Sequence, residues 1–241
     1  MITLYGMRSP NVRKVFIALH ELDLPYTFRF VDVQMGEQFT PEFGRLNPAR
    51  KVPVITDDDG PGGRPITLFE SGAILVYLAE KCGRLLPREP AARATAIQWL
   101  MFQMASVGPM LGQKAHFILY APPGQDYPRL RYSAEMERQC HVMETRLAES
   151  PWLAGDEYGL ADIAVWPWLS LLQERGMGVD LSPLPGLSAW LEAVAARPAV
   201  KAAMAAAAGM PVRDIETIKR DHPDRLALFL GREPQQKAAT P

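Results

Sequence analysis

The sequence predicts a two-domain protein, in which a small mixed α/β domain is followed by an all-helical domain. The length of 241 residues exceeds the roughly 100 to 150 typical of one domain and suits two. Short apolar runs alternate with helical patterns up to about residue 85, and from residue 92 onward only helical spacing is found. Hydrophobic residues make up 48% and charged residues 22%, which excludes a chain too polar to collapse.

The first domain opens with a βαβ pattern. Residues 2–5 form a short apolar run typical of a strand, and residues 10–21 place apolar side chains on one helical face. Residues 26–33 alternate between apolar and polar side chains and predict a second strand. A helix between two strands is the usual connection of a parallel pair.

A hairpin and a helix complete the first domain. After a stretch around residues 39–43, residues 52–55 and 66–69 predict two strands, joined by the turn-rich segment 57–65. Residues 71–81 follow with helical spacing. The order βαβ and then ββα describes a small mixed sheet flanked by helices.

The second domain begins after a break in periodicity. Residues 85–91 hold two prolines and predict a linker. Helical spacing recurs at residues 92–106, 132–149, 160–175, 187–196 and 199–208. From residue 209 the chain is polar, with one apolar patch, 226–230, that is a candidate for docking on the body. The expected divisions are therefore 1–84, 85–91, 92–208 and a C-terminal extension, 209–241.

Charge and residue usage exclude several classes of partner. The 26 basic and 27 acidic residues nearly cancel, so no broad field would attract nucleic acid. Four scattered histidines predict no metal site. The two cysteines, Cys82 and Cys140, lack the CxxC spacing and suit a reducing, cytoplasmic setting. We interpret both as packing residues.

Neither the N-terminal segment nor the uncharged segment 94–113 has the pattern of a membrane-inserted helix. The N-terminus lacks the pattern of a secretory signal and begins directly with a strand, so we expect the mature chain to start there. Residues 94–113 carry no formal charge but include Gln98, Gln103, Gln113 and Pro109. Since a lipid-facing helix would not carry so many amides, we expect a helix buried between other helices.

Short motifs accompany this layout. In the first domain they are Ser9-Pro10-Asn11, Gly36-Glu37-Gln38-Phe39, Asn47-Pro48 with Lys51-Val52-Pro53, and the run 68–81 that begins Leu68-Phe69-Glu70-Ser71. In the second domain they are Gln98-Trp99-Leu100, the run 108–113, Ser150-Pro151-Trp152-Leu153 and Ala161-Asp162-Ile163-Ala164.

Together these motifs resemble the glutathione S-transferase superfamily, and within it the bacterial nu class of glutathione-dependent disulfide-bond oxidoreductases. The resemblance reaches from the first residue to about Ala208. It implies a thioredoxin-like N-terminal domain of order βαβαββα and an all-α C-terminal bundle. It also implies a homodimer that uses glutathione as co-substrate and needs no metal.

Glu70 and Ser71 predict a site for an α-amino acid head. They stand where a strand ends and a helix begins, and the exposed N–H groups there favour an anion such as a carboxylate. Ser71 adds a hydroxyl donor and Glu70 a charge that suits an ammonium group. The pair therefore fits the γ-glutamyl end of glutathione. The plain alternative is that Ser71 is only an N-cap.

The segment around Pro53 predicts a second contact. A proline before a strand forfeits a ladder hydrogen bond, and the resemblance implies a cis Val52–Pro53 bond that turns the Val52 backbone toward the cysteinyl unit of the tripeptide. A trans proline at an edge strand is the alternative. The resemblance places Lys51 and Gln38 near the ligand's ends; without it each would pass as a surface side chain.

Ser9 and Asn11 are the candidate catalytic residues. Ser9 before Pro10 is a common helix start, while the resemblance places the Ser9 hydroxyl and the Asn11 amide beside the bound sulfur, where donors favour the thiolate. The nu-class pattern has threonine where this chain has Ser9. No cysteine stands at this helix start, so the attacking sulfur is expected to come from glutathione. Arg131 resembles an arginine that contacts a glutathione carboxylate; a surface arginine is the alternative.

These residues predict an enzyme that exchanges small disulfides with glutathione, with weaker conjugation of electrophiles. Conjugation as the main task is an alternative that shares the same first domain. A non-catalytic interaction module of the same fold is another, although such modules need not keep Glu70, Ser71, Pro53 and Asn11 together.

Overall fold

A four-stranded mixed sheet forms the first domain in a computed structural model of the chain, which describes residues 1–231. The strands are β1 (Ile2–Gly6), β2 (Tyr26–Phe30), β3 (Val54–Asp57) and β4 (Ile66–Phe69). Their spatial order is β2-β1-β3-β4, with β1 parallel to β2 and antiparallel to β3. Both the βαβ unit and the hairpin are confirmed. The predicted strands at 26–33 and 52–55 are corrected, because β2 ends at Phe30 and β3 begins only after Pro53.

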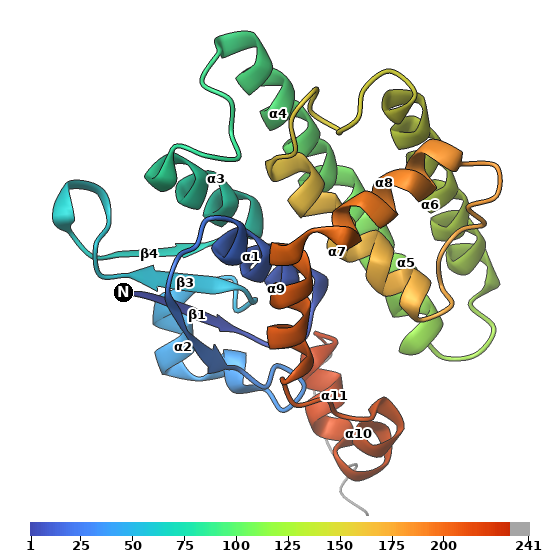
Figure 1. Ribbon diagram of the computed structural model, residues 1–241. Helices are drawn as coiled ribbons and strands as arrows, with labels where there is room; N and C mark the ends of the chain where they lie inside the picture. Colours follow the sequence, from blue (N-terminus) through green and yellow to red (C-terminus); the bar gives the residue numbers. More distant parts are fainter. Residues whose placement is uncertain (232–241) are drawn as a thin grey trace, which may run out of the picture.

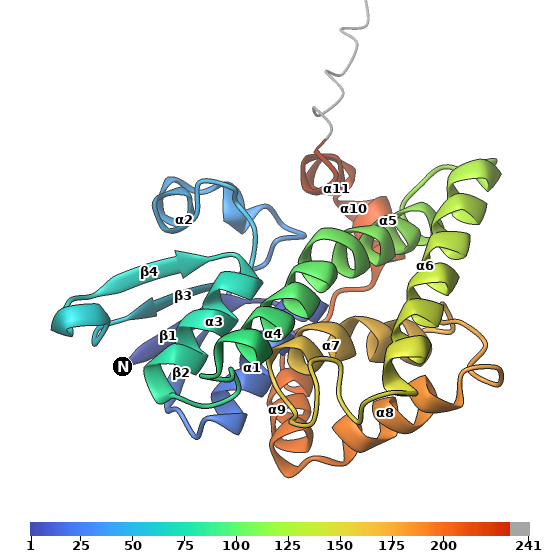
Figure 2. The ribbon, with the colours of Figure 1, turned by 90° about the horizontal axis from the view of Figure 1, so that it is seen from above.

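Helices cover both faces of this sheet (Figures 1 and 2). One face carries α1 (Pro10–Glu21) and α3 (Ser71–Cys82), and the other carries α2 (Pro41–Leu46). Short 3-10 turns lie at Glu37–Phe39 and Pro61–Gly63. The thioredoxin-like order βαβαββα is thereby complete. A second, smaller apolar cluster of Val31, Val33, Phe43 and Val54 lies on the α2 side.

The second domain is entirely helical. Its helices are α4 (Pro90–Phe102), α5 (Gly108–Leu119), α6 (Asp126–Leu147), α7 (Leu160–Glu174), α8 (Pro185–Ala196) and α9 (Pro198–Ala208). A π-helical turn, Gln103–Val107, joins α4 to α5. The prediction ended the first of these helices at residue 106, and the buried helix expected over residues 94–113 covers only the first half of α5. Pro109 does not break the chain there, because it stands in the first turn of α5, where its missing N–H is not needed.

The two domains share one hydrophobic core, which runs from Leu4 and Leu75 to Leu100 and Trp190. Charged pairs add to this junction. Glu21 accepts two hydrogen bonds from Arg197, of 2.6 and 2.9 Å, and Arg13 lies 3.1 Å from Glu174. Both pairs hold α1 against the helical domain, so the start of α1 is fixed relative to the second domain.

The chain after α9 folds back toward the first domain (Figure 1). It forms α10 (Ile215–Asp221) and α11 (Pro223–Phe229). Phe229 packs against the second apolar cluster, and Arg213 Nε lies 2.5 Å from Asp32 Oδ2. The expected docking of the apolar patch 226–230 is therefore confirmed. Residues 232–241 of the predicted extension lie outside the described residues.

Within residues 1–231, no helix combines the length and the apolar character needed to cross a membrane. The uncharged segment 94–113 runs from α4 through the π-turn into α5. Its Leu100, Val107 and Leu111 are fully buried, which agrees with a helix packed between other helices.

Candidate functional site

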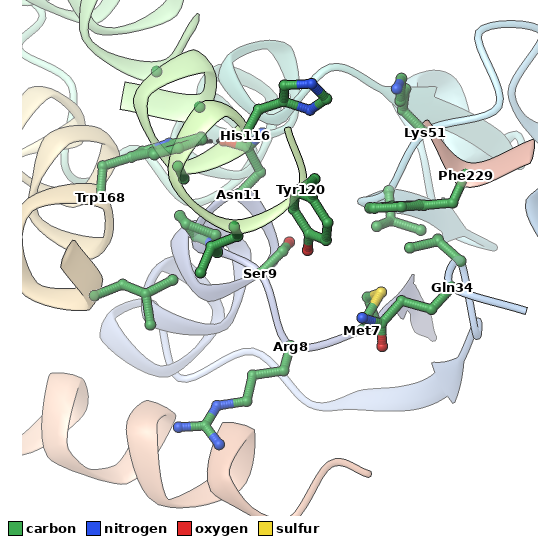
Figure 3. Close-up of a pocket in the computed structure, with 18 of the residues that line it drawn as sticks. Met7, Arg8, Ser9, Asn11, Gln34, Lys51, His116, Tyr120, Trp168 and Phe229 are labelled. Atoms are coloured by element: carbon green, nitrogen blue, oxygen red, sulfur yellow. Dashed lines mark hydrogen bonds between the residues drawn. The ribbon is translucent and has the colours of Figure 1, made fainter. Parts of the chain in front are cut away.

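A cleft of about 1050 Å³ lies between the two domains. The loop from β1 into α1 forms one side, and α5 and α7 form the other; Figure 3 shows Ser9, Asn11 and Lys51 among the residues around it. The structure brings six of the predicted site residues to this cleft: Ser9, Asn11, Gln38, Lys51, Val52 and Glu70. Pro53 and Ser71 are buried next to Val52 and Glu70. Arg131 does not line the cleft.

Ser9 caps α1 and also faces the cleft. Its Oγ accepts a hydrogen bond from the Val12 N–H at 3.3 Å, as expected for a helix N-cap. A hydroxyl that accepts through a lone pair keeps its own hydrogen for donation. The capping and ligand-binding interpretations of Ser9 are therefore compatible.

Asn11 is oriented by a residue of the other domain. Its Oδ1 accepts from Trp168 Nε1 of α7 at 3.0 Å, the contact drawn in Figure 3. Because the oxygen is used in this way, the NH₂ end of the amide is the part that can donate to a ligand. Sequence reasoning missed this contact, since the two residues are 157 positions apart.

Glu70 and Ser71 differ in detail from the prediction. Glu70, not Ser71, is the N-cap of α3, and its side chain makes no capping hydrogen bond. Its backbone has φ 68° and ψ 110°, in a region that residues other than glycine rarely adopt and that recurs at functional sites. Ser71 begins the helix itself and is buried. The interpretation of Ser71 as a mere N-cap is therefore wrong.

Lys14 lies on the floor of the cleft and was missed by the sequence analysis. Its side chain is fully buried, and its Nζ donates to Gln103 Oε1 at 2.6 Å and to Ser71 Oγ at 3.2 Å. Burial lowers the pKa of Lys14 to about 7, while the charge of Glu70 acts in the opposite direction. One signal could have found it: Lys14 follows Asn11 by three residues and so shares its helix face.

The segment before β3 lies at the cleft, which Lys51 and Val52 line. The Val52–Pro53 bond is cis, which excludes the trans alternative. Asn47 Nδ2 donates to the Lys51 carbonyl at 2.8 Å and fixes this turn. Gln38 is also buried, and its Oε1 has no hydrogen-bond partner among the residues that the structure describes. A buried amide oxygen without a partner is costly unless a ligand or water supplies a donor.

The remaining predicted residues lie elsewhere. Arg131 is on the exposed side of α6, 3.5 Å from Glu135. Cys140 is fully buried in α6, where burial raises the pKa of its thiol to about 12, and neither cysteine lines the cleft. The packing interpretation of Cys140 is confirmed. In the part of the chain that the structure describes, no cluster of His, Cys, Asp and Glu could hold a metal ion.

Two family models match the two domains. Residues 8–81 match the N-terminal domain of glutathione S-transferases, and residues 109–198 match their C-terminal domain. The disulfide-bond oxidoreductase YfcG of Escherichia coli is 44% identical over 205 residues, which cover 85% of this chain and 94% of that protein. The chain belongs to the glutathione S-transferase family.

Solved structures of related transferases agree with this assignment. A glutathione transferase of Burkholderia graminis, solved with two glutathione molecules per subunit, superposes with a TM-score of 0.81 and 45% identity, over 84% of this chain and 87% of that one. A transferase of Pseudomonas putida, solved with one glutathione disulfide per subunit, has a TM-score of 0.80 and 41% identity, over 84% and 90%. The predicted family and fold are thus confirmed.

The C-terminal segment, which follows the residues matched by the family models, forms a further wall of the cleft of this transferase. Residues 211–213 and 228–231 line the cleft. The Phe229 ring contacts the Tyr120 ring of α5 at 5.7 Å between centroids, and Figure 3 shows both beside the cleft. The C-terminal segment therefore connects the first domain to α5 across one side of the cleft.

Proposed function

We propose that this transferase is a glutathione-dependent disulfide-bond oxidoreductase whose attacking sulfur belongs to bound glutathione. The observation that carries the proposal is the start of α1, where Ser9 and Asn11 offer a hydroxyl and an oriented amide to a cleft that neither cysteine lines. Donors of this kind favour a thiolate over a thiol. Ser9 and Asn11 are the proposed catalytic residues.

The remaining site residues are assigned to the tripeptide. Glu70 and Ser71 would take the ammonium and carboxylate of the γ-glutamyl end. The Val52 backbone, turned by the cis bond to Pro53, would pair with the cysteinyl unit. A second group, Gln38 and Lys51, would hold the ends of the ligand, and the unpartnered Oε1 of Gln38 supports this. The proposed contact of Arg131 with a glutathione carboxylate has no support from the cleft of a single chain.

The reaction proceeds as two thiol–disulfide exchanges. The thiolate of one glutathione attacks a sulfur of the substrate disulfide, so that a mixed disulfide forms and the other half leaves as a thiolate, which takes a proton. A second glutathione attacks the glutathione sulfur of the mixed disulfide, releases the second thiol and forms glutathione disulfide. The relatives from B. graminis and P. putida bind two glutathione molecules and glutathione disulfide, respectively, which are the reductant and the oxidised product of this scheme.

Steady-state assays with glutathione and a small disulfide test the proposal. We expect turnover well above the uncatalysed exchange, and rates equal to the uncatalysed reaction would refute it. Ser9→Ala and Asn11→Ala should each lower kcat by about tenfold or more with little change in glutathione affinity, as expected for groups that act on the thiolate. Unchanged kcat in both variants would remove their proposed roles.

Conjugation of electrophiles is the second candidate function, favoured by the apolar wall that Trp168, Leu228 and Phe229 give the cleft. Rates with a small disulfide and with an apolar electrophile, compared on one preparation, separate the two.

A thermal shift on adding millimolar glutathione tests the non-catalytic alternative, because a ligand that binds only the folded state must raise its stability. We further propose that the protein is cytoplasmic and that it forms a homodimer. Sedimentation of the full chain would test the dimer.

A further inference from the structure

Lys14 is a buried lysine whose side-chain nitrogen contacts uncharged groups among residues 1–231. Its Nζ donates to Gln103 Oε1 at 2.6 Å and Ser71 Oγ at 3.2 Å, and lies 3.6 Å from Met104 Sδ. None of its side chain is exposed. An isolated charge of this kind is costly inside a protein unless a counter-charge is present, so a fold that keeps it invites a functional explanation.

The surroundings of Lys14 favour an incoming anion. Ser71 begins the 12-residue helix α3, so the positive end of that helix lies beside the ammonium. Glu70 is the charged group whose field reaches Lys14, whereas Gln103 and Met104 of the π-turn and Ser71 of α3 are uncharged. Glu70 is itself exposed at the cleft and is assigned above to the ligand's ammonium.

We propose that Lys14 is a positioning residue of the glutathione site, which directs the Ser71 hydroxyl toward the γ-glutamyl carboxylate and takes that carboxylate as its counter-charge. This inference rests on the proposed function, since it requires glutathione at Glu70 and Ser71.

The hydrogen-bond directions support this role. The ammonium group can only donate, so Ser71 Oγ must accept from it. The hydroxyl hydrogen of Ser71 is then left for another partner, and among residues 1–231 the acceptor recorded for it is the weak one, Met104 Sδ, 3.7 Å from Ser71 Oγ. A ligand carboxylate would be a far better acceptor.

Ligand binding should therefore be linked to the uptake of protons by Lys14. With a pKa of about 7, Lys14 is only partly protonated near neutral pH in the ligand-free protein. An approaching carboxylate favours the charged form, so binding should take up a fraction of a proton. A purely structural lysine would give no such uptake.

Calorimetric titration with S-methylglutathione, which has no free thiol to titrate, tests this inference. Measurements near pH 7.5 in two buffers of different ionisation enthalpy give the number of protons taken up. We expect uptake by the wild-type protein. Lys14→Met should abolish the uptake and weaken binding by about tenfold or more, while the ligand-free melting temperature stays equal or rises because a buried charge has been removed.

Lys114→Met is the matched control. Lys114 is also buried, and its Nζ contacts Met136 Sδ at 3.4 Å, but it does not line the cleft. This variant should keep the wild-type affinity within about twofold and keep the proton uptake.

The outcomes separate the two proposals. Wild-type protein that does not bind S-methylglutathione would refute the proposed function. Binding without proton uptake, which needs no variant to measure, would overturn the role of Lys14 alone. A folded Lys14→Met protein with wild-type affinity and uptake would also overturn it.

Discussion

Replacement of Trp168 by phenylalanine tests whether α7 positions the Asn11 amide, which we propose to be catalytic. The indole Nε1 donates to Asn11 Oδ1 over 3.0 Å in a partly buried setting. A neutral hydrogen bond of this kind contributes about 0.5–1.5 kcal/mol net. If the bond serves to orient the amide in the transition state, its loss should lower kcat by about two- to twelvefold, because about 1.4 kcal/mol corresponds to a factor of ten. Glutathione affinity should change little.

The assay is steady-state reduction of a small disulfide by glutathione, with melting temperatures measured in parallel. Trp166→Phe is the matched control, since Trp166 lies in the same helix and donates to the Leu191 carbonyl at the same distance of 3.0 Å, without lining the cleft. Both variants should lose similar stability, and only Trp168→Phe should lose turnover.

A double-mutant cycle decides the mechanism. If Trp168 acts through Asn11, then Trp168→Phe should have little further effect on kcat in an Asn11→Ala background. An equal loss of kcat in both backgrounds would refute the reasoning and leave Trp168 as a wall of the cleft only.

Three further outcomes are expected. The double variant Cys82→Ala, Cys140→Ala should keep its disulfide exchange rate within about twofold. It should lose about 1 kcal/mol of stability, because Cys140 is fully buried. A variant that folds and binds glutathione but is inactive would show that a protein thiol is required. Phe229→Ala removes the ring that packs on the second apolar cluster and on Tyr120, so the melting temperature should fall and the kcat/KM ratio of bulky to small disulfides should rise; an unchanged ratio would contradict a role of this wall in selection. The pKa of Lys14 is about 7 in the folded protein against 10.5 for a free lysine, so the unfolded chain binds more protons between these pH values and the free energy of unfolding should rise with pH there. Urea unfolding at pH 7 and 9 should show a smaller rise in Lys14→Met than in the wild-type protein. Equal rises would contradict the burial of a titrating lysine.

Some of the fold could be read directly from neighbouring residues. The helix that begins after Ser9 and the hairpin of β3 and β4 follow from local periodicity and turn residues. The two-domain layout needed only the change of pattern near residue 85. Glu70 and Ser71 could be picked out locally, because a strand-to-helix junction carries its own donors, whereas Val52 was placed by the resemblance to glutathione S-transferases.

Other features could not be read from the spacing of the residues. The helix α5 tolerates Pro109 in its first turn and follows a π-turn, and the spacing of the sequence did not indicate that turn. Arg131 resembles an arginine of the family but does not line the cleft; it is exposed and lies 3.5 Å from Glu135, one turn further along α6.

The sequence by itself determined which elements form and which short motifs stand at their ends, because helix and strand patterns depend on side chains a few positions apart. Only the tertiary structure decided the burial of Lys14 beneath Ser71, the orientation of Asn11 by Trp168 and the closure of one side of the cleft by Phe229. Each of these joins residues that are far apart along the chain, and their burial and hydrogen-bond partners exist only after the two domains have packed together.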